Sequence, residues 1–248
     1  MPNLPTHIHF SSEAVSHIPG LDKELHLGAF IFGATAPDMR ALTKKDRAVY
    51  HFVNLDFEEV GEGIRNLIGK YPEWGSLSST NLEAKSFVAG YASHLILDET
   101  WITSMFRPYF GNALIFPEKI HGLVMDRAVQ LSLDKAHWNS MKPYLNSIEA
   151  YKSPVKVDFL YAEPLDEWRK WILNLLMADF SWERLRFMAN RISRNQKSNG
   201  ATESADEFLA RPESKLLDVL GLLPSGAIEN FARVGNCNIV SALNRLLA

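Results

Sequence analysis

The stretch that decides the fold reads FVAGYASHLILDETW and covers residues 87–101. It is apolar over most of its length, and it carries His94 and Asp98 four residues apart. On a helix, positions i and i+4 share a face, so the imidazole and the carboxylate would point to the same place. A buried charge is costly unless it is paired or bound to a metal ion. The spacing therefore predicts either a hydrogen-bonded His–Asp pair in the core or a metal site on a buried helix.

Helical periodicity extends from this stretch through nearly the whole chain. No run of strict apolar/polar alternation indicates a strand with one exposed face. Asn81 is expected to cap the helix that carries His94, and Arg107, Pro108 and Gly111 are expected to mark its end. Residues 77–81 are predicted to form a loop, and residues 38–54 a short, polar and irregular segment. Further helices are predicted over residues 6–17, 22–36, 57–71, 117–135, 138–150, 165–179 and 181–195.

Residues 196–204, rich in Ser, Asn, Gly and Thr, form the most linker-like stretch of the chain. We therefore expect an all-α fold with one helical domain over residues 1–195. Residues 196–248 are expected to supply the linker and a small C-terminal helical appendage of the same compact unit. A length of 248 residues is sufficient for a sizeable core.

Composition narrows the class of protein. The net charge of -3 argues against a nucleic-acid partner held by bulk charge. The single cysteine, Cys237, allows no internal disulfide and no thiolate metal cluster, which fits a reducing compartment. The first residues show no basic segment followed by an apolar one, and no apolar run reaches the ~18–20 residues of a membrane span. We expect a soluble, cytoplasmic protein.

Potential metal ligands gather in the first hundred residues. Imidazole nitrogen and carboxylate oxygen suit zinc, and also manganese or iron. Each of these side chains also has a structural interpretation, such as a helix cap for an aspartate or a half-buried position for a histidine. The candidates are His7, Asp38, His51, His94 and Asp98.

The order and context of these residues favour the metal. Thr6-His7 near the N-terminus, then FGATAPD at residues 32–38, YHF at 50–52 and GYASHLILD at 90–98 together resemble the zinc-dependent phospholipase C family. That family is related to the zinc-dependent single-strand nucleases, and the resemblance covers roughly residues 1–130. It implies an all-α, multi-helix bundle, in agreement with the periodicity.

The resemblance also implies a ligand set. Asp38, His51, His94 and Asp98 match the ligands of one zinc ion. His7 matches a ligand of a second ion, which shares the carboxylate of the His-x-x-x-Asp motif, here Asp98. One or two zinc ions are therefore expected, with manganese or iron as alternatives.

The chain departs from the family at its third metal. That metal needs a histidine shortly after the His-x-x-x-Asp motif, where this chain has Ser104 and Met105, and then a His-x-x-x-Glu/Asp pair. His121 is followed four residues later by Met125 and only then by Asp126. On a helix, the fifth residue points about 140° away from the first. We therefore expect the third metal site to be lost or rebuilt, with His121 retained as a pocket residue.

The expected chemistry is hydrolysis of a phosphoester. A zinc ion with an open position lowers the pKa of its water toward about 7 and supplies a metal-bound hydroxide near neutral pH. The segment MRALTKKDR at residues 39–47 lies between two proposed ligands and carries four cations. Its alternative interpretation is a solvated loop. Within it, Arg40 and Arg47 are the better phosphate ligands, because a guanidinium binds phosphate through two hydrogen bonds.

The favoured function is a metal-dependent phosphoester or phosphodiester hydrolase that resembles zinc-dependent phospholipase C. Its substrate would be a phosphate-containing small molecule or a lipid head group, and a homo-oligomer is left open. One alternative is a nucleotide phosphohydrolase, although the chain lacks the His-Asp dipeptide typical of one such class. The other is a non-catalytic helical interaction module with a structural or decayed metal site.

Overall fold

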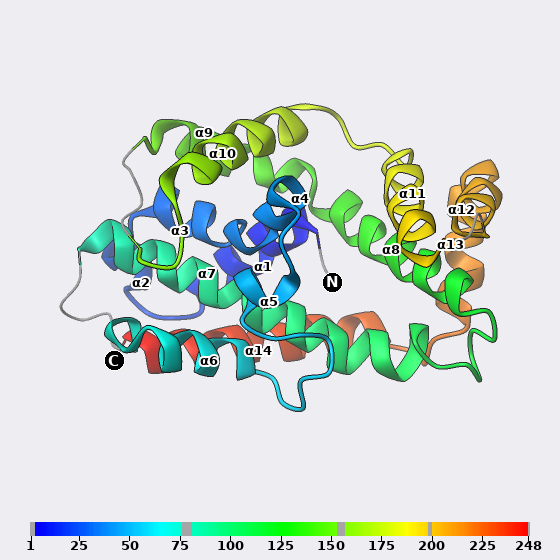
Figure 1. The fold of residues 1–248 in the computed structure, drawn as a ribbon, viewed down its shortest axis with the longest axis horizontal. Helices are drawn as coiled ribbons and strands as arrows, with labels where there is room; N and C mark the ends of the chain where they lie inside the picture. Colours follow the sequence, from blue (N-terminus) through cyan, green and yellow to red (C-terminus); the bar gives the residue numbers. More distant parts are fainter. Residues whose placement is uncertain (1–2, 76–80, 153–156, 198–199, 248) are drawn as a thin grey trace.

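A long buried helix, α7 (Leu82–Trp101), forms the centre of the computed structural model, and the other helices pack around it (Figure 1). Nearly every α7 side chain after the first turn is buried, including those on faces that a surface helix would expose. Asn81 caps its start by accepting a hydrogen bond from the Glu83 amide at 2.8 Å. The structure describes residues 3–75, 81–152, 157–197 and 200–247, and no strand occurs among them. The all-α class predicted from periodicity is therefore confirmed.

The helices that follow the chain agree closely with the sequence prediction, apart from their ends. The loop expected at 77–81 lies outside the described residues except for Asn81. The bounds are α1 (Leu4–Ser16), α2 (Leu21–Glu24), α3 (Leu27–Gly33), η1 (Ala36–Met39), α4 (Arg40–Thr43), α5 (Arg47–His51), α6 (Glu62–Lys70), η2 (Pro72–Trp74), η3 (Ile102–Phe110), α8 (Lys119–His137), η4 (Asn139–Met141), α9 (Lys142–Ala150), α10 (Ala162–Met177), α11 (Arg184–Gln196), α12 (Gly200–Ala210), α13 (Pro212–Gly221) and α14 (Ala227–Leu247).

Three local predictions are corrected. The helix expected over residues 22–36 is two helices, because Leu25 is extended and the His26 imidazole starts α3 by accepting from the Ala29 amide. The central helix does not end at Arg107–Pro108. It continues with wider turns through η3, which contains Pro108, and reaches Phe110. Helix α12 begins at Gly200, inside the stretch expected to be a linker.

Helices α3 and α7 cross in unusually close contact, and two glycines make this crossing feasible. A Cβ on Gly90 would lie 1.9 Å from the Phe30 carbonyl oxygen, and one on Gly33 would lie 2.0 Å from that of Phe87. Both neighbours are backbone atoms, so no side chain can move aside to make room. The crossing brings the C-terminal end of α3 against the middle of α7.

The C-terminal helices complete the packing. Helix α14 lies along α7 and buries Phe231, Ile239 and Leu243. Helices α11, α12 and α13 gather at one end of the molecule and pack on α8 (Figure 1). None of the helices in the described part of the chain has both the length and the apolarity that a membrane span requires.

Candidate metal centre

The predicted ligands converge on one point beside the middle of α7. His94 and Asp98 project from α7, His7 comes from α1, Asp38 from η1 and His51 from the last turn of α5. Ligand atoms of His7, His94 and Asp98 lie within 4.8 Å of one another, and the same holds for Asp38, His51 and His94. The structure therefore brings all five together, from four separate elements.

Asp98 lies between two histidines and presents one oxygen to each. Its Oδ1 is 3.3 Å from His7 Nε2, and its Oδ2 is 3.1 Å from His51 Nε2. The Oδ2 atom also accepts a hydrogen bond from Arg47 Nη2 at 3.0 Å. Burial alone would raise the pKa of Asp98, but Arg47, His51 and His7 together hold it well below its usual value. The carboxylate therefore stays ionised.

The tautomer of His94 follows from its contact with α3. Its Nδ1 lies 2.8 Å from the Ala34 carbonyl oxygen, which can only accept a hydrogen bond. Nδ1 therefore carries the proton, and Nε2 presents its lone pair to the cluster, 3.9 Å from Asp98 Oδ2. Burial, followed by the nearby His7, lowers the pKa of His94 well below its usual value, so the ring is neutral. A neutral imidazole held by a backbone carbonyl is the usual state of a metal ligand.

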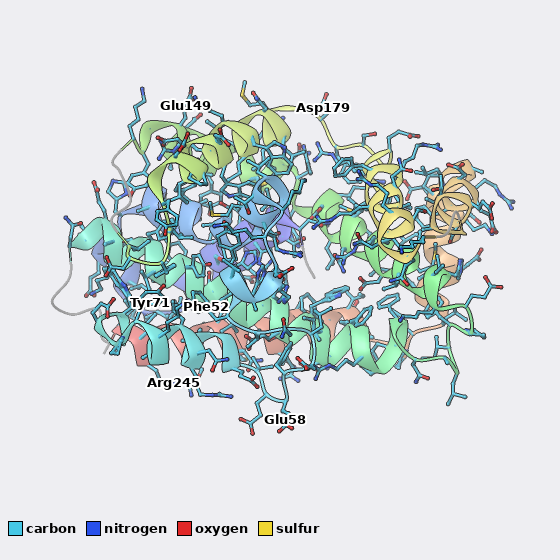
Figure 2. The ribbon with its side chains drawn as sticks, in the orientation of Figure 1. Phe52, Glu58, Tyr71, Glu149, Asp179 and Arg245 are labelled. Carbon is cyan, nitrogen blue, oxygen red and sulfur yellow. The ribbon has the colours of Figure 1, made fainter. Side chains whose placement is uncertain are left out.

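His51 is held in place by the structure that ends α5. Phe52 follows it in a left-handed conformation, with φ 59°, and terminates the helix. The Phe52 ring packs against those of Tyr71, Tyr91 and Phe159; Figure 2 marks Phe52 and Tyr71 on this side of the molecule. Burial, followed by the charge of Arg47, lowers the pKa of His51, so this imidazole is neutral too.

Glu99 supports this arrangement from α7 but does not contact a ligand imidazole, as a second-shell role would require. Its carboxylate accepts hydrogen bonds from the backbone amides of Gly61 and Gly63, at the start of α6. A Cβ on Gly63 would also lie 2.7 Å from the His51 carbonyl oxygen, so α6 begins directly against the end of α5. Burial raises the pKa of Glu99 to about 7. Glu99 thus joins α7 to the segment that carries His51.

Several polar atoms of the cluster are buried and have no hydrogen-bond partner among the described residues. They are His7 Nε2, His51 Nε2, His94 Nε2 and Asp98 Oδ1. Each buried, unsatisfied polar atom costs about 1–3 kcal/mol, so four cost roughly 4–12 kcal/mol. That sum is comparable to the whole stability of a typical domain, about 5–15 kcal/mol. A metal ion bound by these nitrogens and oxygens would remove the cost, so the donor set fits zinc.

Solvent reaches the cluster from one side. His7, His51, His94 and Asp98 are fully buried, whereas Asp38 is half-buried. Arg40, in the helix that follows Asp38, is also half-buried, and Arg47 is buried. The predicted phosphate ligands Arg40 and Arg47 therefore lie at the cluster, Arg47 through its contact with Asp98. Arg191 on α11 is close enough to Arg40 to contribute to lowering the Arg40 pKa, after the larger effect of burial. Sequence reasoning missed Arg191, because nothing in α11 points to a residue about 150 positions earlier.

The structure does not bring His121 to the cluster. Its Nδ1 lies 2.8 Å from Ser204 Oγ, in a cleft of about 590 Å³ between the start of α8 and α12. Asp134, further along α8, contacts Thr6 beside His7. Thirteen residues of helix separate His121 from Asp134, about 20 Å at 1.5 Å per residue. His121 is a cleft residue, but the cleft is not at the five-residue cluster.

Asp126, expected to be poorly placed for a third metal, is engaged elsewhere. Its Oδ1 accepts from Trp101 Nε1 and its Oδ2 from Gln130 Nε2, both at 2.8 Å. Ser104, at the position expected for a histidine, donates to the Thr100 carbonyl oxygen. These side chains pack η3 and α8 against α7. Loss of the third metal remains a prediction.

The comparison with protein families agrees with the resemblance seen in the sequence. Residues 6–101 match the sequence model of the family described as zinc dependent phospholipase C. The matched segment begins at Thr6 and ends at Trp101, so it contains all five candidate ligands and both arginines of the segment between them. No curated protein and no solved structure matches the chain.

Proposed function

We propose that this protein is a zinc-dependent phosphoester hydrolase. The observation that carries the proposal is the set of buried, unsatisfied ligand atoms on His7, His51, His94 and Asp98, in a segment that matches a zinc-dependent phospholipase family. His94, Asp98, His51 and Asp38 would hold the principal ion. His7 would hold a second ion together with Asp98, whose two oxygens already face different histidines.

The metal and the chain divide the chemistry. A zinc ion at this position lowers the pKa of a coordinated water toward about 7 and so supplies a nucleophile near neutral pH. Asp98 remains an anion and the imidazoles of His51 and His94 remain neutral, which are the protonation states that ligands require. The apolar surroundings of α7 exclude bulk water and strengthen the attraction between the ligands and the ion.

The substrate would enter on the side of Asp38. Arg40 lies at this side, where its guanidinium can bind a phosphate through two parallel hydrogen bonds. The substrate class is a phosphate-containing small molecule or a lipid head group. The proposal includes a cytoplasmic location, supported by the single, exposed Cys237.

One observation favours a second function. Four of the five candidate ligands are fully buried, and structural zinc sites are closed whereas catalytic ones keep an open position. A helical interaction module with a structural zinc ion would have such a site. Solvent access at Asp38 favours the hydrolase.

Elemental analysis of the untagged protein tests the metal site. The wild type is expected to carry one or two equivalents of zinc, and both His94→Ala and Asp98→Ala are expected to lose them. Two matched controls keep the metal. His137→Ala removes a histidine that stacks on His9, away from the cluster, and Asp126→Asn changes another buried aspartate. Wild type that stays metal-free after incubation with zinc, manganese and iron would exclude the proposal.

A turnover assay then separates the hydrolase from the interaction module. Chromogenic phosphomonoesters and phosphodiesters are offered to the zinc-loaded protein. Hydrolysis that disappears in Asp98→Ala and persists in His137→Ala supports the enzyme. A protein that holds zinc but hydrolyses neither class is the structural alternative.

A further inference from the structure

A group of arginines from three different helices lies on the accessible side of the cluster. Arg40 belongs to α4, Arg47 to α5 and Arg191 to α11. Arg47 contacts Asp98 directly. Arg40 interacts electrostatically with Asp38 and Asp98, and also with Arg47 and Arg191. Like charges repel, so a group of guanidiniums on one side of a site needs an anion to be stable.

Arg40 and Arg191 are not neutralised by carboxylates in contact with them. Among the described residues, neither forms an ion pair within 4.0 Å, whereas Arg47 pairs with Asp98 at 3.0 Å. The Arg40 Nε atom is buried and has no hydrogen-bond partner. A buried N–H donor without an acceptor costs about as much as a lost hydrogen bond. This donor is independent evidence that an acceptor binds beside Arg40.

The charge balance indicates what kind of anion fits. Three arginines and the carboxylates of Asp38 and Asp98 sum to one positive charge, and each zinc ion adds two. A site with a net charge of about three or more attracts a dianion more strongly than a monoanion, and it repels a cationic head group. A phosphomonoester is a dianion above its second pKa of about 6, whereas a phosphodiester carries one charge.

We propose that Arg40 and Arg191, backed by Arg47, form an anion subsite that makes this enzyme selective for phosphomonoester dianions over esters with cationic head groups. The inference rests on the proposed function, because the subsite adjoins the proposed zinc ligands. Two guanidiniums that bind the free phosphate oxygens would hold the ester beside the ligands, while the cluster attacks phosphorus. Arg191 is a binding residue in this scheme and has no part in holding the metal.

Three substrates with the same leaving group test the selectivity at pH 8. These are p-nitrophenyl phosphate, a dianion; bis(p-nitrophenyl) phosphate, a monoanion; and p-nitrophenyl phosphorylcholine, a zwitterion. In Arg191→Gln, kcat/KM for the dianion is expected to fall at least about tenfold, through a higher KM, since a charged hydrogen bond is lost. The rate for the phosphorylcholine ester is expected to stay the same or rise.

Matched variants exclude a loss of structure. Arg194→Gln changes an exposed arginine of the same helix, which donates only to the Asn190 carbonyl oxygen, and is expected to behave as wild type. Arg191→Lys keeps the charge but loses the planar fork, and its kcat/KM for the dianion is expected to fall between wild type and Arg191→Gln. Zinc content and circular dichroism are expected to be the same in all variants.

A binding measurement makes the subsite testable apart from catalysis. Calorimetric titration of the zinc-loaded protein with inorganic phosphate is expected to show binding that is at least about tenfold weaker in Arg191→Gln. Equal losses for all three substrates, or no loss for any, would overturn the subsite and leave the hydrolase intact. If no substrate is hydrolysed, the proposed function fails, and the phosphate titration alone decides the subsite: equal affinity in wild type and Arg191→Gln overturns it.

Discussion

Two groups of buried carboxylates lie within the same fold, and they are satisfied in opposite ways. On α8, Asp126 accepts from Trp101 and Gln130, and Asp134 accepts from Asn3 and Thr6. On α7, Asp98 faces imidazoles that do not complete its hydrogen bonds, and its Oδ1 has no partner.

The difference teaches which buried charge serves the fold and which is a candidate site. The donors around Asp126 and Asp134 are neutral side chains and a backbone amide, which bind nothing else once the carboxylate is satisfied. The groups around Asp98 are metal-ligand atoms, and they gain only when an ion joins them. Changes to each group should therefore affect different measurements.

The largest expected effect comes from removing the metal. Chelation of the wild type is expected to lower the free energy of unfolding by about 4 kcal/mol, the stabilisation from a ligand present at a thousand times its dissociation constant. Asp98→Asn is expected to show no change on chelation, because it no longer binds the ion. Thermal unfolding with and without EDTA measures both. A wild type whose melting temperature ignores EDTA and added zinc would remove the distinction between the two groups.

The next effect tests whether the metal centre depends on the α3–α7 crossing. Gly90→Ala places a Cβ against the Phe30 carbonyl oxygen and must push the helices apart, at a cost of about 3 kcal/mol or more. The shift would also move Ala34 away from His94, so zinc affinity should fall. Gly69→Ala, where a Cβ would meet nothing within 4 Å, is the control. Denaturant unfolding and zinc titration measure the two losses, and unchanged zinc affinity would separate the cluster from the crossing.

The pH dependence of stability should distinguish the carboxylates on α8. Burial raises the pKa of Asp134 to about 6 despite its hydrogen bonds from Thr6 and Asn3. Between pH 4 and 6 the native state then binds more protons than the unfolded state, so this group makes stability fall as pH rises. A shift of about two pKa units corresponds to up to about 3 kcal/mol.

Asp134→Asn cannot titrate, so it should lose this contribution. Unfolding is followed from pH 4 to 7 in EDTA, which keeps proton competition for the metal out of the comparison. The difference in the free energy of unfolding between variant and wild type is expected to grow in favour of the variant as pH rises to 6. A difference that is constant with pH would contradict the raised pKa.

The smallest expected effect comes from Asp126→Asn. It keeps the side-chain shape, but the new amide cannot accept from both Trp101 and Gln130, so stability should fall by about 2 kcal/mol. Zinc content should not change. Denaturant unfolding and elemental analysis together check this, and loss of zinc in Asp126→Asn would mean that α8 is part of the metal centre.

Much of this comparison was visible in the sequence, because it depends on local spacing. The four-residue step from His94 to Asp98 places both on one helix face, and the order of motifs from His7 to Asp98 points to the family whose model matches residues 6–101. The ends of elements were less predictable. Leu25 and His26 break a helix that composition alone favours, since the break depends on the His26 backbone amide donating to Ser86 of α7.

The sequence by itself determined the helical class and the candidate ligands, because periodicity and motif spacing are properties of neighbouring residues. Only the tertiary structure decided which groups complete the site. The Ala34 carbonyl sets the tautomer of His94, Asp126 and Asp134 are occupied by donors from other helices, and Arg191 approaches Arg40 from α11. These contacts join residues far apart in the chain. Their geometry depends on how closely the helices pack, which at α3 and α7 is set by the missing side chains of Gly33 and Gly90.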